Sequence, residues 1–144
     1  MIELVEDRLD IDTYLELRQS VQFRELTRDQ AKKGLSNSLY TLVAFKDGKA
    51  VGMGRIVGDG AIICYVQDLI IRPEVQGEGI GGLILETLKK FVIQEGYEGT
   101  TMMFDLMCAK GMEEFYKKHV FIARPTKDLG PGMIQFIQIG SDEQ

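Results

Sequence analysis

The stretch that decides the fold runs from Val66 to Gly81 and reads VQDLIIRPEVQGEGIG. It begins with an apolar strand that Pro73 ends, because proline has no N–H to give to a β-ladder. Glycines then follow at alternate positions, at Gly77, Gly79 and Gly81, and a helix begins among them. Such a backbone can bring several N–H groups close to an anion, and the positive end of the helix favours the same ligand. The stretch therefore predicts a phosphate or pyrophosphate site.

Two common nucleotide-binding motifs fit this stretch poorly. The Walker A loop needs Gly-Lys-Ser/Thr after its glycines, and the sequence has none there. The spacing Gly77-x-Gly79-x-x-Gly82 formally matches the dinucleotide fingerprint. That fingerprint belongs after the first strand of a parallel sheet, whereas here it follows hairpins, so we interpret the match as accidental.

Hydrophobic periodicity and turn signals predict the elements around the loop. Strands are expected at 2–5, 39–45, 50–57, 61–72, 100–108, 121–124 and 133–139. Helices are expected at 11–20, 28–35, 79–95 and 111–119. The order β-α-α-β-β-β-α-β-α-β-β predicts an α/β (α+β) fold, with a mixed, mostly antiparallel sheet of about seven strands flanked by helices.

Local signals mark the ends of several of these elements. Asp10 is placed to cap the first helix, and Thr27 with Gln30 forms a capping-box pattern before the second. The pairs Asp47-Gly48 and Asp59-Gly60 are typical of tight hairpin turns.

Composition limits the function classes. The 144 residues predict a single domain over 1–144, and a net charge of −5, without a basic run, argues against nucleic acid as a partner. The longest apolar run, 61–66, is far too short to cross a bilayer, and the acidic N-terminus does not resemble a signal peptide. Cys64, Cys108 and one histidine predict neither a disulfide framework nor a metal site. A soluble, cytoplasmic protein without membrane contact is expected.

Three features together resemble the GNAT N-acetyltransferase superfamily, and in particular its small bacterial members. The loop QGEGIG at 76–81 resembles the Q/R-x-x-G-x-G/A signature, and DLIIRP resembles the strand before it. EEFYKKHVF at 113–121 resembles the family's FYxKxGF segment, and the predicted element order agrees from end to end. The resemblance implies direct transfer of an acetyl group from acetyl-coenzyme A to a primary amine, without a metal.

The resemblance also implies where the cosubstrate binds. In this family the loop holds the pyrophosphate of acetyl-coenzyme A, and the backbone of the strand before it pairs with the pantetheine amides. The implied residues are Leu69, Ile70, Ile71, Gln76, Gly77, Glu78, Gly79, Ile80 and Gly81. A backbone N–H near Ile70 would polarise the thioester carbonyl.

Tyr116 occupies the position of the family's frequent tyrosine, which implies a general acid for the departing thiolate. A phenol has a pKa of about 10, so it is protonated at neutral pH. The alternative is an aromatic side chain that packs the last helix. The segment also departs from the family: Val120 stands where glycine is usual. Lys110 stands where many members have an asparagine that contacts the pantetheine side.

Asp68 lies in an apolar strand and, on strict alternation, shares a face with Val66 and Ile70. It would orient or deprotonate the acceptor amine, or else be an acid satisfied by its neighbours. Phe23 and Glu25 resemble the acceptor-side wall of small family members, the alternative being a solvated turn.

The acceptor itself is not named by the sequence. A small-molecule amine or a peptide amine would fit, and the acidic balance favours a cationic one. Two other functions remain open, a coenzyme-A-binding regulatory module without transfer activity and a nucleotide-phosphate enzyme. Exposed C-terminal strands often pair in this family, which leaves a homodimer open.

Overall fold

The computed structural model describes residues 1–140 of the chain. These residues fall into two compact units, one from Met1 to Met107 and the other from Cys108 onward. The first unit contains β1 (Ile2–Glu6), α1 (Ile11–Ser20), α2 (Arg28–Ser36), β2 (Tyr40–Lys46), β3 (Lys49–Gly58), β4 (Ile63–Ile71), a 3₁₀ turn (Pro73–Val75), α3 (Ile80–Glu95) and β5 (Met103–Leu106). The second contains α4 (Glu113–Lys118). A single domain over 1–144 stays a prediction.

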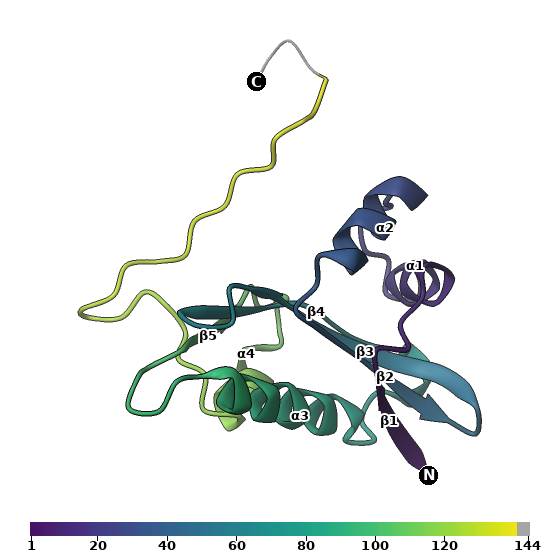
Figure 1. Cartoon of the computed structure of the whole chain (residues 1–144), viewed down its shortest axis with the longest axis horizontal. Helices are drawn as coiled ribbons and strands as arrows, with labels where there is room; N and C mark the ends of the chain where they lie inside the picture. The colour runs from purple at the N-terminus through teal and green to yellow at the C-terminus, as the bar shows by residue number, and fades with distance from the viewer. Residues whose placement is uncertain (141–144) are drawn as a thin grey trace. The chain divides into compact units, whose positions relative to one another are not determined.

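The strands of the first unit form one sheet in the order β1-β2-β3-β4-β5. The first four strands pair antiparallel, and β5 pairs parallel to β4. Helices α1 and α2 lie on one face of the sheet and α3 lies on the other (Figure 1). Each face has its own apolar cluster, which includes Ile84 and Leu88 of α3 on one side and Tyr14 and Leu17 of α1 on the other. The mixed α/β fold is therefore confirmed.

Three of the local signals in the sequence form as predicted, whereas the connection at Asp59-Gly60 is longer than a tight turn, because β3 ends at Gly58 and β4 begins at Ile63. Asp10 accepts a hydrogen bond from the Thr13 N–H at 2.8 Å and begins α1. Thr27 and Gln30 exchange the two hydrogen bonds of a capping box at the start of α2. Asp47 and Gly48 have φ values of 51° and 78°, as a tight turn between β2 and β3 requires.

Two predicted strands are wrong. The segments 121–124 and 133–139 carry no strand in the structure, so the sheet has five strands among the described residues instead of about seven. Met133 and Ile139 are 88% and 82% exposed, whereas a strand within a sheet would bury one face. A short apolar run becomes a strand only when another strand pairs with it, and local sequence does not specify that partner.

A β-bulge at Gln67 changes the face of β4. Arg55 pairs with Asp68 and Ile56 pairs with Val66, so the exposed Gln67 has no opposite residue on β3. Val66 consequently packs on the α3 side, while Asp68 faces α1. The expectation that Asp68 shares a face with Ile70 is correct, but the same expectation for Val66 is wrong because the bulge breaks the alternation.

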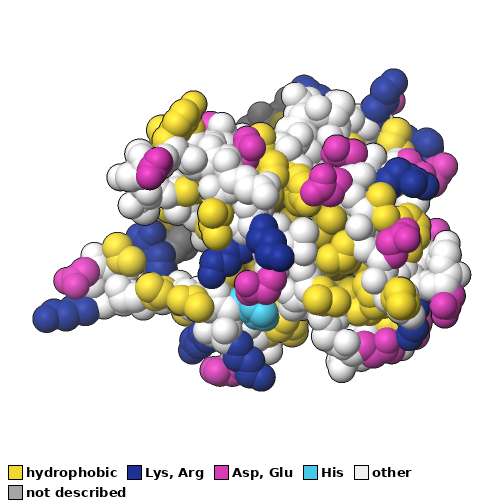
Figure 2. Space-filling model, turned by 60° about the horizontal axis from the view of Figure 1, so that its bottom comes forward, with side chains coloured by type: hydrophobic (Ala, Val, Ile, Leu, Met, Phe, Trp, Pro, Cys, Tyr) yellow, Lys and Arg dark blue, Asp and Glu magenta, His cyan; other side chains and the backbone are white. Residues whose placement is uncertain are grey.

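Figure 2 shows a surface on which acidic and basic side chains are interspersed. Among residues 1–140, no helix combines the length and apolar character that a membrane crossing needs.

Two glycines in β3 let α3 approach the sheet closely. A Cβ built on Gly54 would lie 2.7 Å from Cγ2 of Ile84 and 3.0 Å from Cδ1 of Leu88. A Cβ on Gly52 would lie 2.9 Å from the carbonyl oxygen of Ile70 on β4 and 3.3 Å from Cδ1 of Ile84 on α3. Because interiors are close-packed, α3 can keep its place only while these positions lack side chains.

We expect Gly54→Ala to lower the free energy of unfolding by about 1–3 kcal/mol, the usual cost of overpacking. Gly34→Ala is the control, because its Cβ would meet nothing within 4 Å and alanine favours the helix α2. Urea denaturation followed by circular dichroism measures both variants. Equal midpoints for Gly54→Ala and the wild type would refute the packing argument.

Candidate functional site

The glycine-rich loop between β4 and α3 exposes its backbone. Gly77 and Gly79 have φ values of 87° and 85°, a region that favours glycine, and a Cβ at either position would meet nothing within 4 Å. Val75 and Ile80 are buried on the two sides of the loop and anchor it. The Gln76 side chain donates a hydrogen bond to the Ile71 carbonyl at 3.0 Å, which ties the loop to the end of β4. The start of α3 is thus open to an anion.

Glu78 places an acidic side chain between Gly77 and Gly79 of this loop. Its Oε1 lies 2.8 Å from Nζ of Lys46, at the end of β2. The hydrogen bond that Lys46 donates to Glu78 raises the pKa of Lys46, so the ammonium is held in its charged form. The ion pair balances the charge of Glu78 beside the exposed loop backbone.

The edge of β4 next to β5 is only partly paired. The β4–β5 ladder ends at Val66 and Leu106, so among residues 1–140 the part of β4 from 67 to 71 has no strand on that side. The Arg72 N–H donates to the Val51 carbonyl on β3. Because successive residues of a strand point their polar backbone groups to opposite sides, those of Leu69 and Ile71 face the open edge.

This alternation refines the predicted role of the backbone near Ile70. Ile70 is in register with Met53, and its N–H points toward β3, like that of Arg72. The N–H groups of Leu69 and Ile71 are the ones directed to the open edge. A ligand that extends from the loop along β4 would meet these two residues.

Asp68 is the centre of a buried hydrogen-bonded cluster. Its carboxylate accepts hydrogen bonds from the Tyr14 hydroxyl at 2.7 Å, from Nη1 of Arg18 at 3.1 Å and from Nε of Arg55 at 2.8 Å. The Asp68 side chain is 1% exposed. Burial and the Asp68 charge raise the pKa of Tyr14, so this hydroxyl stays a donor. Deprotonation of an amine by Asp68 stays a prediction, and the contacts favour the alternative of an acid satisfied by its neighbours.

The predicted acceptor residues Phe23 and Glu25 line a pocket of about 380 Å³. The pocket lies at the end of α1 and in the turn that follows it; its other lining residues are Leu15, Arg18, Gln19, Gln22, Arg24 and Leu26. Arg18 connects the pocket to the cluster, because its Nη2 donates to the Arg24 carbonyl at 2.9 Å while Nη1 binds Asp68. The guanidinium of Arg18 also lies 5.4 Å from the centre of the Phe23 ring.

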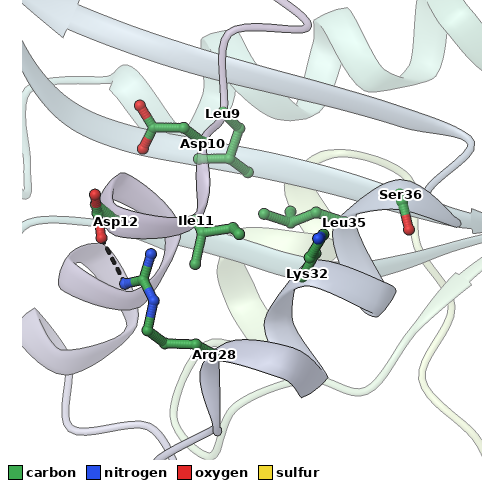
Figure 3. Close-up of a pocket in the computed structure, with 8 residues that line it drawn as sticks. All are labelled: Leu9, Asp10, Ile11, Asp12, Arg28, Lys32, Leu35 and Ser36. Carbon is green, nitrogen blue, oxygen red and sulfur yellow. Dashed lines mark hydrogen bonds and ion pairs between the residues drawn. The ribbon is translucent and has the colours of Figure 1, made fainter.

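A second pocket, of about 480 Å³, lies between α1 and α2 (Figure 3). Its polar groups have local structural roles: Asp10 caps α1, and Arg28 and Asp12 form an exposed ion pair at 2.7 Å. None of the predicted site residues lines it.

In the second unit, a Schellman motif holds Tyr116. At the end of α4 the Phe121 N–H donates to the Tyr116 carbonyl, and the Val120 N–H donates to the Lys117 carbonyl. The rings of Tyr116 and Phe121 meet edge to face, with centroids 5.8 Å apart. Val120 occupies the position of this motif that usually holds glycine, and its φ is 71°. The turn therefore keeps the glycine-like conformation although the residue differs.

Burial, with a smaller effect from Cys108, raises the pKa of Tyr116 to about 12. The hydroxyl is therefore protonated at neutral pH. Tyr116 lies in α4, within the helix expected at 111–119. Its catalytic role stays a prediction.

Sequence reasoning missed the partners of Asp68. Tyr14 and Arg18 come from α1 and Arg55 comes from β3. An acid in an apolar strand indicates that some cation is near, but its identity depends on how the helix and sheet meet. Lys46, the partner of Glu78, was missed for the same reason.

The fold and site define an α/β domain that presents an open strand edge and a helix that begins in an exposed glycine backbone. Residues 37–123 match the family model of the acetyltransferase (GNAT) domain. The N-acetyltransferase ycf52 of Pyropia yezoensis is 30% identical over 100 residues, which cover 67% of this chain and 55% of that protein. The chain thus spans about half the length of this relative.

Solved structures agree over nearly the whole chain. A protein from meticillin-resistant Staphylococcus aureus superposes with a TM-score of 0.83 at 28% identity, covering 95% of this chain and 100% of that one. A GNAT-family acetyltransferase from Streptococcus pneumoniae has a TM-score of 0.78 at 28% identity, with coverages of 96% and 99%. The chain belongs to the GNAT acetyltransferase family.

We expect Val120→Gly to stabilise the protein. A β-branched residue at positive φ is strained, and the Val120 side chain is 78% exposed, so little packing is lost. The free energy of unfolding should rise by on the order of 1 kcal/mol. Thermal unfolding measures the change, with Val120→Ala as the control, because alanine removes the branch but keeps the Cβ. A lower melting temperature for the glycine variant would contradict the strain.

Proposed function

We propose that this protein transfers an acetyl group from acetyl-coenzyme A to a primary amine. The observation that carries the proposal is the exposed glycine loop at the end of an open-edged strand, in a chain of this family. The loop suits a pyrophosphate because its backbone is bare and the start of α3 is positive. The open edge suits an amide chain, which can pair with it as an added strand would.

The binding roles follow from the two parts of the site. The loop residues Gln76, Gly77, Glu78, Gly79, Ile80 and Gly81 would hold the pyrophosphate, mainly through backbone N–H groups. The backbone of Leu69 and Ile71 would pair with the pantetheine amides. The Leu69 N–H, which is nearer than that of Ile71 to the closed end of the open edge, would donate to the thioester oxygen and stabilise the negative charge that develops there.

The reaction needs a neutral amine, a polarised carbonyl and a proton for the leaving sulfur. The amine nitrogen attacks the thioester carbon, a C–N bond forms and the C–S bond breaks. Tyr116 would give its proton to the departing sulfur and regain one from solvent. Much of the rate would come from holding the reactants in position.

The acceptor would bind in the pocket lined by Phe23 and Glu25. Arg18 and Arg24 line the same pocket, so it presents both signs of charge. The cationic acceptor stays a prediction that rests on Glu25, with a small-molecule or peptide amine as the class. The homodimer and the cytoplasmic location stay predictions as well.

The second candidate is a regulatory module that binds coenzyme A without transfer activity. Thiol release from acetyl-coenzyme A across a panel of amines separates the two functions. Turnover with any amine supports the enzyme, whereas coenzyme A binding without turnover supports the module.

The loop assignment predicts that coenzyme A raises the melting temperature of the wild type, since it binds the native state. Gly79→Asp should abolish this shift, because a carboxylate would stand where a phosphate belongs. Gly99→Asp is the matched control: its φ is 80°, and a Cβ there also meets nothing within 4 Å. An equal shift for Gly79→Asp and Gly99→Asp would refute the assignment.

The general-acid role predicts that Tyr116→Phe lowers the turnover number by ~10²-fold or more and leaves coenzyme A binding nearly unchanged. Because the pKa of Tyr116 is about 12, the wild-type rate should not fall through loss of this proton until the pH approaches that value. Tyr97→Phe, at an exposed tyrosine, is the control. Steady-state kinetics from neutral to alkaline pH measure both variants, and an unchanged turnover number would leave Tyr116 a packing residue.

A further inference from the structure

Asp105 on β5 has a carboxylate with no role in the reaction proposed above. Its Oδ1 is buried and has no hydrogen-bond partner among the residues that the structure describes. Asp105 pairs in register with Tyr65 of β4, while its neighbours Phe104 and Leu106 pack into the α3 cluster. Asp105 therefore lies on the opposite face of the sheet, the face of α1 and Asp68.

An ionised carboxylate in this position destabilises the folded state. Asp105 as a whole is partly buried, and a charged group that loses hydration normally finds a partner to replace it. Burial raises the pKa of the Asp105 carboxyl, and its own backbone N–H offsets only part of that rise. The titratable groups of β4 around it are the Tyr65 hydroxyl and the Cys64 thiol, whose pKa values its charge helps to raise. The charge of Asp68 also raises the pKa of Tyr65.

The place of Asp105 in the sheet suggests its use, and this step rests on the proposed acetyl transfer. A chain that starts at the glycine loop and pairs with the open edge of β4 runs from Ile71 toward Gln67. These five residues span roughly 17 Å at about 3.3 Å each. The open edge ends where β5 joins β4 at Val66 and Leu106, and Asp105 is one residue from that point. The reacting end of the ligand would thus meet this carboxylate.

We propose that Asp105 is the catalytic base that takes a proton from the acceptor ammonium. A free carboxylate oxygen beside the closed end of the β4 edge can accept this proton, whereas the Asp68 carboxylate already accepts three hydrogen bonds. Asp68 instead positions Arg18 and, through it, the turn that carries the acceptor pocket.

The proposed reaction releases one proton for each acetyl group transferred. The ammonium gives one proton to Asp105 and becomes a neutral amine, and Asp105 later releases that proton to water. After attack, the nitrogen loses its second proton to solvent and becomes the amide. The sulfur leaves with the C–S electron pair and takes the Tyr116 proton, which solvent replaces. The sum is an amide, a thiol and one proton released.

The test uses an amine from the panel that the wild type acetylates. It measures kcat/KM for this amine between pH 5 and 9 with the wild type, Asp105→Asn and Asp105→Glu. The wild type should lose activity on the acid side as Asp105 takes a proton. Asp105→Asn should be slower by ~10²-fold or more and should keep only the pH dependence of the amine itself. Asp105→Glu keeps a carboxylate and should restore part of the rate together with the acid-side fall.

Stability gives a readout that does not depend on activity. The raised pKa means that ionised Asp105 destabilises the fold above the pKa of the unfolded state, about 3.9. Asp105→Asn should therefore melt at or above the wild-type temperature at pH 7, and any gain should vanish below about pH 4. Asp7→Asn, at an exposed aspartate whose φ of 56° asparagine tolerates, is the control for charge loss.

The outcomes separate the two proposals. If the wild type turns over but Asp105→Asn matches it in rate and pH profile, the assignment of Asp105 is wrong and the acetyl transfer stands. A slow Asp105→Asn that melts well below the wild type at pH 7 and keeps the acid-side fall would show a structural role and overturn the base. If the wild type releases thiol with no amine of the panel, the acetyl transfer fails, and the base falls with it.

Discussion

The buried charge of Asp68 is the constraint on which the sheet and its α1–α2 face depend. A carboxylate removed from water is tolerated only when donors replace its hydration, and a buried ion pair is strongly destabilised when one partner is lost. Tyr14 and Arg18 supply donors from α1, and Arg55 supplies another from β3. Arg55 also donates to the Gly34 carbonyl in α2. One carboxylate therefore connects β3, β4 and both helices of this face.

The bulge at Gln67 makes this arrangement compatible with an apolar strand. If β4 kept regular alternation through Gln67, Asp68 would point with Val66 into the α3 cluster, where no donor of this set could reach it. With the bulge, Cys64 and Val66 complete one core while Asp68 and Ile70 face the other. The bulge also lies where the open edge of β4 begins. The change of face and the open edge thus coincide at one point of the strand.

The parts of the fold that depend on near neighbours in the chain could be predicted from the sequence. The helix at 80–95, the capping box of Thr27 and the turn at Asp47 are set within a few residues of themselves. The glycine loop could be predicted for the same reason, because its conformation is local.

Features that depend on distant residues could not be predicted. The side of the sheet that Asp68 faces depends on one bulge residue, Gln67, and strict alternation does not reveal a bulge. The partners of Asp68 lie up to 54 residues away in the chain. The apolar runs at 121–124 and 133–139 look like strands by composition, yet a strand also needs a pairing edge, and composition does not supply one.

Val120 and Asp105 each break a local rule of folding, and they differ in what the break achieves. Val120 has a positive φ, but its side chain points to solvent and does no chemistry, so a glycine would serve the same turn with less strain. Among the residues that the structure describes, one carboxylate oxygen of Asp105 has no hydrogen-bond partner, and the amide of an asparagine could not replace it as a proton acceptor. Strain or desolvation indicates function only when the chemistry requires that particular group. By this criterion Asp105 is a candidate for the proposed chemistry, whereas Val120 only shapes the turn that follows Tyr116.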